Sequence, residues 1–109
     1  AAAAVQGASA SVLGNTFIAR GRTPAVDVSA SAEVLFNDNR CELRASGRTV
    51  AVQLNTPVAI INANRVRGGG ESSIIVSNSK ALVAAIGNIT TRPINAPLKP
   101  EMVPLNLIG

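Results

Sequence analysis

Strict alternation of apolar and polar residues over positions 26–36 constrains the fold of this chain more than any other feature. In an extended strand the apolar members would share one face: Val26, Val28, Ala30, Ala32, Val34 and Phe36. A period of two sustained over such a length is typical of a strand with one buried face and one solvated face. The sequence therefore predicts a half-buried strand here, of the kind found in antiparallel sheets.

Similar alternation recurs in short runs that turn signals separate. Residues 41–46 and 49–54 both alternate, and the intervening Ser46–Gly47–Arg48 predicts a tight hairpin turn. Residues 80–86 fit either a short helix or a buried strand, and their β-rich surroundings favour a strand. The whole pattern predicts an all-β fold, a small antiparallel sandwich or barrel.

The two ends of the chain differ from the middle. Residues 1–11 carry only small side chains and Gln6, while residues 92–109 hold four prolines among apolar residues. Proline is excluded from central strands and helix interiors. We therefore expect an antiparallel β-domain over residues 12–91, with an extended N-terminal arm (1–11) and a Pro-rich C-terminal arm (92–109).

The composition argues against catalysis. The chain has no His, Trp or Tyr, and Cys41 is its one cysteine. Without His, the Ser-His and Cys-His arrangements and the common zinc spacings are not available. We expect no enzyme activity, no cofactor, no metal site and no membrane span, because no apolar run is long enough to cross a bilayer.

Arginine dominates the charge. The net charge is +4, and eight of the ten basic residues are Arg, whose planar fork suits carboxylates, phosphates and protein interfaces. The C-terminal segment adds apolar side chains that would be a liability if left exposed. The residues expected to bind a partner are Arg20, Arg22, Arg65, Arg67, Ile94, Leu98, Met102, Val103, Leu105 and Leu107.

These features together predict a non-enzymatic structural subunit of a larger assembly, and a homo-oligomer that uses arms and strand edges. A virion component fits first, such as a capsid decoration or tail protein, found in the virion or in the host cytoplasm before assembly. A secreted filament or pilus subunit, built extracellularly by strand complementation, is the alternative. A nucleic-acid-binding β-barrel is a third and less favoured reading, because aromatic stacking residues are missing beside the arginines. The first residue, Ala1, is compatible with removal of Met and with signal cleavage.

Overall fold

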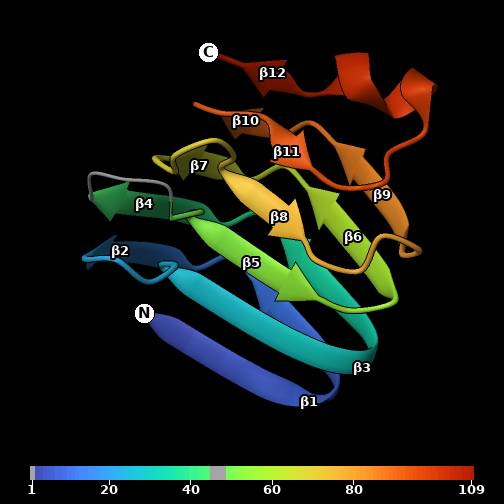
Figure 1. Ribbon diagram of the computed structural model, residues 1–109, viewed down its shortest axis with the longest axis horizontal. Helices are drawn as coiled ribbons and strands as arrows, with labels where there is room; N and C mark the ends of the chain where they lie inside the picture. Colours follow the sequence, from blue (N-terminus) through green and yellow to red (C-terminus); the bar gives the residue numbers. More distant parts are fainter. Residues whose placement is uncertain (1, 45–48) are drawn as a thin grey trace.

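A computed structural model describes residues 2–44 and 49–109, and its strands wind into a parallel β-solenoid (Figure 1). The chain is 57% strand and 6% helix, so the predicted all-β character is confirmed. The predicted antiparallel sandwich or barrel is wrong, because neighbouring strands in both sheets run parallel. Alternation of side chains tells which face is buried, but it does not tell the direction of the neighbouring strand.

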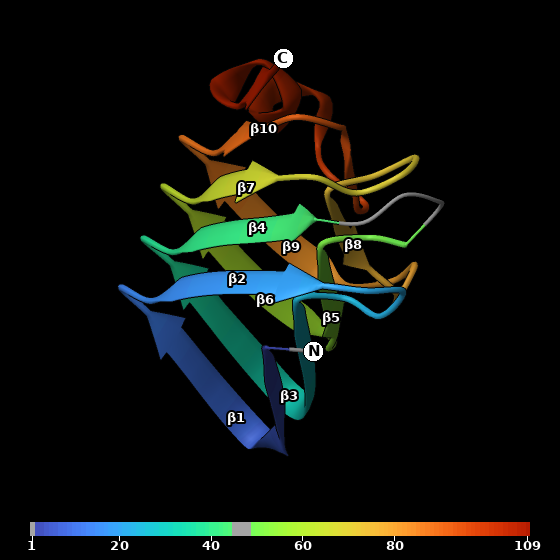
Figure 2. The ribbon, with the colours of Figure 1, turned by 90° about the vertical axis from the view of Figure 1, so that its left-hand side faces the viewer.

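Each coil of the solenoid passes along three faces (Figure 2). The first two coils begin with long strands that bend around a corner and so belong to two faces: β1 (Ala3–Leu13) and β3 (Val26–Asn37). The first face continues with β5 (Val52–Asn55), β8 (Ile74–Val76) and β11 (Ile94–Asn95). The second face continues with β6 (Val58–Asn62) and β9 (Leu82–Ile86). The third face stacks β2 (Thr16–Arg20), β4 (Arg40–Arg44), β7 (Arg65–Arg67), β10 (Ile89–Thr90) and β12 (Leu107–Ile108).

The core is built by stacking one coil on the next in register. Val26 pairs with Val52, which pairs with Ile74, and all three side chains are fully buried. The same stacking places Phe36 beside Ile61. The alternation predicted for residues 26–36 is confirmed for five of its six apolar positions; Ala32 is exposed because it lies at the bend of β3.

The predicted hairpin between residues 41–46 and 49–54 is wrong. β4 lies on the third face and pairs with β2 and β7, whereas β5 lies on the first face and pairs with β3 and β8. The turn expected at residues 46–48 lies outside the described residues. Residues 82–86 form strand β9, as the surroundings suggested.

The extended arms are a second error in the predicted fold. Residues 3–13 form β1, which pairs along its length with β3 as part of the first coil. Residues 94–108 wind as the last coil, in which the 3₁₀ helix η1 (Pro100–Leu105) takes the place of a strand on the second face. Two of the four prolines that argued against a strand lie in this helix, Pro100 at its first turn and Pro104 inside it.

A ladder of asparagines, buried in its middle, runs along one corner of the solenoid, between the second and third faces. Its members are one coil apart: Asn15, Asn39, Asn64, Asn88 and Asn106. The backbone N–H of each of the first four donates to the side-chain Oδ1 of the next, at 2.9–3.1 Å. From Asn39 onward, each Nδ2 also donates to a backbone carbonyl of the preceding coil, at 2.7–2.9 Å. Buried turn amides and carbonyls therefore find partners that a sharp corner would otherwise leave unsatisfied.

The residue before each of the first four ladder asparagines has a positive φ. These residues are Gly14, Asp38, Ala63 and Gly87, with φ between 55° and 72°. This single residue in the left-handed conformation redirects the chain from the second face to the third face, so that the corner needs only two residues between the strands. Glycine tolerates this conformation best and aspartate tolerates it better than most residues, which explains three of the four choices.

The ladder is closed at the C-terminal end of the molecule. There Asn106 donates its backbone N–H to the carbonyl of Val103 and its Nδ2 to the carbonyl of Met102. Both acceptors belong to η1. These bonds replace the contact to a following coil. The 3₁₀ helix and Asn106 thus cap the second face and its corner at this end, while the outer edges of β11 and β12 pair with no further described strand.

Candidate functional site

The opposite end of the solenoid carries no such cap within the described residues. We call the outer edges of β1 and β2 the N-terminal edge; neither strand pairs with another described strand on that side. The Oδ1 atom of Asn15 likewise accepts no hydrogen bond from a described residue. The N-terminal edge therefore presents unused backbone groups along both strands (Figure 2).

The side chains of β1 are apolar or small apart from Gln6, and β1 carries no charge, whereas β2 ends in Arg20. Val5 points toward the core and is nevertheless 38% exposed, because no coil of the described residues covers it on that side. Phe17 and Ala19 of β2 are half-buried against the core for the same reason. Natural proteins usually protect such an edge with charge, proline or a covering segment, and β1 has none of these.

A second distinctive surface is the outer side of the third face, which we call the arginine face. Five arginines project from it, together with one glutamate: Arg20, Arg40, Arg44, Arg65, Arg67 and Glu42. Alternation places them outward because Cys41 and Val66, between them in sequence, are buried. Parallel register places Arg40 beside Arg65, and Arg20 beside Arg44.

Glu42 neutralises one of these arginines. Arg44 donates to it with two atoms, Nε to Oε1 at 3.2 Å and Nη2 to Oε2 at 3.4 Å. This hydrogen bonding, together with the nearby charges of Arg44, Arg67 and Arg40, lowers the pKa of the Glu42 carboxyl. Within the described residues, Arg40, Arg65 and Arg67 have no ion pair of their own.

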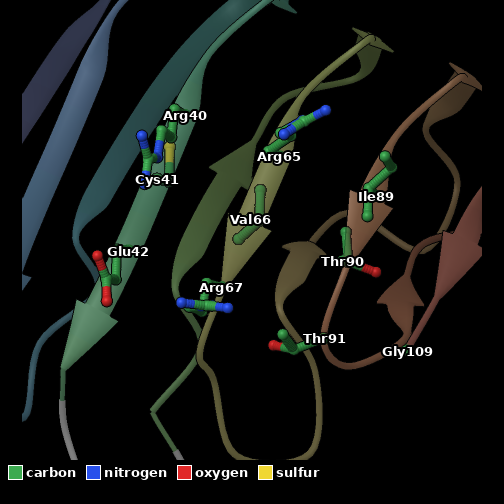
Figure 3. A pocket seen from close by; sticks show the side chains of 10 residues that line it. All are labelled: Arg40, Cys41, Glu42, Arg65, Val66, Arg67, Ile89, Thr90, Thr91 and Gly109. Atoms are coloured by element: carbon green, nitrogen blue, oxygen red, sulfur yellow. The ribbon is translucent and has the colours of Figure 1, made fainter.

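A hollow of about 410 Å³ lies on the arginine face between β4, β7 and β10. Figure 3 shows Arg40, Glu42, Arg65 and Arg67 around it, with Ile89 and Thr91 on the far side. The hollow is open to solvent and its rim is basic.

The structure separates the residues that the sequence suggested for partner binding. Arg20, Arg65 and Arg67 lie on the arginine face, whereas Arg22 lies in the loop between β2 and β3. The sequence reasoning missed Arg40 and Arg44. Arg40 and Arg44 lie one coil before Arg65 and Arg67. The sequence shows that these residues are spatial neighbours only when the length of one coil is known.

The apolar candidates of the C-terminal segment are divided as well. Ile94 and Leu98 pack against the core of their own chain, and Met102 is half-buried in η1. Val103, Leu105 and Leu107 remain about half exposed or more, at 52%, 48% and 66%. Their role in binding a partner stays a prediction.

Cys41 lies beneath the arginine face, with its side chain in the core. Burial raises the pKa of this thiol from about 9.0 to about 12, so the neutral form is strongly favoured in the folded chain. The thiolate is the reactive species, and Cys41 is therefore not a candidate nucleophile.

This burial predicts a pH dependence of stability. The folded chain keeps the thiol protonated, whereas the unfolded chain releases the proton above its ordinary pKa. The contribution of the buried Cys41 thiol to the free energy of unfolding is thus fully present below pH 9 and falls as the pH rises toward 12. We expect the free energy of unfolding to drop between these values in urea titrations, and Cys41→Ala to flatten the drop; an equal drop in the variant would contradict this origin.

No helix within residues 2–44 and 49–109 has the length and apolarity needed to traverse a bilayer. The same residues bring together no group of three acidic, Cys or His side chains that would hold a metal ion.

The fold and its repeated corner asparagines define this chain as a parallel β-solenoid. Comparison with protein-family models, with curated proteins and with solved structures finds no match. The two surfaces described above therefore carry the functional argument.

Proposed function

We propose that this chain is a non-enzymatic structural module that assembles with a second copy of itself through the N-terminal edge. The observation that carries the proposal is the uncharged outer edge of β1. This strand has eleven residues, and no described strand pairs with it on the side away from β3. An exposed edge of this length readily accepts another strand by backbone hydrogen bonding.

The shape of β1 suits an isologous pair. The register with β3 shifts between Gly7 and Ser9, where the strand turns the corner. A two-fold axis through that corner would place the first half of β1 against the second half of its copy, with the strands antiparallel. Val5 would then face Ala10 of the copy, and both side chains point toward the core.

The same two-fold axis suits the third face. It would place β2 against β2 of the copy with Ile18 at the centre, so that Phe17 of one copy would cover Ala19 of the other. The two half-buried apolar side chains on this strand would thereby become fully buried. A closed two-fold dimer is also the commonest form of homo-oligomer.

The C-terminal end offers a shorter edge than the N-terminal end. Its outermost strands, β11 and β12, have two residues each, and η1 takes the place of a strand on the second face. A head-to-tail filament would have to pair this short edge with the eleven residues of β1, so a two-fold pair of N-terminal edges is the better match. Within the class of structural subunits we keep a virion component as the first candidate and a strand-complemented filament or pilus subunit as the second.

The oligomeric state of the 109-residue chain tests the proposal. We expect a dimer by sedimentation equilibrium at micromolar concentration. Val5→Lys should give a monomer, because the dimer would bury an unpaired charge while the monomer leaves this side chain partly in water. Leu82→Lys is the matched control: Leu82 is 73% exposed on the second face, and this variant should remain dimeric.

Two results would end the proposal. One is a wild-type chain that stays monomeric over the whole concentration range. The other is a Val5→Lys variant as dimeric as Leu82→Lys. Circular dichroism of each variant confirms that the solenoid is intact.

A further inference from the structure

The arginine face holds two like charges side by side, and Glu42, the carboxylate on this face, forms its ion pair with Arg44 and not with either of them. Arg40 and Arg65 are directly opposite each other on adjacent strands. Their next neighbours in the same column are Thr16 and Ile89, so no carboxylate follows on either side. Like charges directly opposite in a sheet are destabilising, and a bound anion would remove that cost.

The hollow gives such an anion a place. Arg40 and Arg65 lie on one strand pair at its rim, and Arg67 lies two residues further along β7 (Figure 3). Glu42 pairs with Arg44 and lies directly opposite Arg67, so Arg40 and Arg65 are the guanidinium groups most available to a ligand. Arginine forks bind carboxylate groups with two parallel hydrogen bonds.

We propose that this hollow binds the carboxylate groups of an acidic polysaccharide, one built from uronic-acid sugars. Adjacent coils lie about 4.8 Å apart, close to the length of one sugar ring, so neighbouring arginines along the solenoid axis can meet successive units of such a polymer. Ile89 and Thr91 offer an aliphatic surface and a hydroxyl for the rest of the ring.

Nucleic acid fits this surface less well. Proteins that bind single strands combine basic grooves with aromatic side chains on which the bases stack. The aromatic residues of this chain are Phe17 and Phe36, and both point into the core.

Binding to polygalacturonate tests the inference, with uncharged dextran and poly(dT) as comparison polymers. We expect the wild-type chain to bind polygalacturonate at low salt and to release it as salt is raised. The double variant Arg40→Gln/Arg65→Gln should bind polygalacturonate about tenfold or more weakly, because it loses the charge-assisted hydrogen bonds from both guanidinium groups to the carboxylates of the polymer. The matched control, Arg22→Gln/Lys80→Gln, removes the same charge from exposed positions outside the lining of the hollow and should lose less than about twofold.

The stability of these variants separates binding from folding. Because Arg40 and Arg65 have no ion pair in the described part of the chain, replacing them should leave the melting temperature unchanged or slightly higher. Repeating the titration with the monomeric Val5→Lys variant keeps this result independent of assembly. Equal losses in the two double variants, binding to poly(dT) as tight as to polygalacturonate, or no binding to polygalacturonate would each overturn the inference.

Discussion

Replacing Asn64 by alanine is expected to destabilise the chain by about 3 kcal/mol or more, because it leaves several buried hydrogen-bonding groups without partners. Asn64 is fully buried. Its Oδ1 accepts from the backbone and side chain of Asn39, and its Nδ2 donates to Phe36 and Asn88. Domains of this size are stable by only about 5–15 kcal/mol in total. The loss corresponds to roughly 12–24 °C in melting temperature, which differential scanning calorimetry would measure.

Asn15→Ala provides the matched control for Asn64→Ala. Asn15 is exposed at the start of the asparagine ladder, and its side chain donates to Leu13 and, at 3.4 Å, to Asn39. Water can replace these bonds, so we expect a loss below about 1 kcal/mol. Similar losses in the two variants would show that the buried ladder does not stabilise the solenoid.

The asparagine ladder is also a signal in the sequence from which the solenoid could have been predicted. The predicted sandwich or barrel did not take it into account. Asn15, Asn39, Asn64 and Asn88 recur every 24 or 25 residues, each after a residue with positive φ. A repeat of that length is the mark of a solenoid, in which each coil buries its apolar face only against its neighbours. Each asparagine on its own was indistinguishable from an ordinary turn residue.

Strand identity was easier to predict than strand pairing. The alternation at 26–36 reports which side chains are buried, and that depends on the strand alone. The hairpin at 41–54 failed because pairing depends on where the chain goes after the turn. Residues 40–44 and 52–55 end on different faces, and nothing within those segments distinguishes a return along the same sheet from a passage around a corner.

The candidate surfaces depended on the coil period in the same way. Arg65 and Arg67 were visible in the sequence as a basic pair, but their neighbours Arg40 and Glu42 lie one coil earlier. The uncharged edge at β1 was predicted to be an arm, since small side chains bury little area on their own. Pairing with β3 gives those residues a place in the first coil, and their role as a contact surface stays a prediction.

Replacing Val34 by aspartate is expected to unfold the chain at neutral pH. Val34 is fully buried on β3 beside Ala59, so the introduced carboxylate would lack both water and a partner. The effective cost of burying such an ion is several kcal/mol, and the lost apolar contacts add to it. Circular dichroism should show loss of the β signal, and the fully buried Val52 should behave in the same way.

The neighbouring residue supplies the control for this variant. Leu35 lies one position along β3 with its side chain on the opposite side of the sheet, and it is only half-buried. Leu35→Asp should therefore leave a folded chain with a reduced melting temperature. Wild-type melting of Val34→Asp would show that the assigned core face is wrong. This pair of variants tests burial alone, which a sandwich and a solenoid would share; the Asn64 variant tests the parallel stacking of coils. A chain that unfolds with Val34→Asp but tolerates Asn64→Ala would have the predicted inner face and yet lose its support for the solenoid.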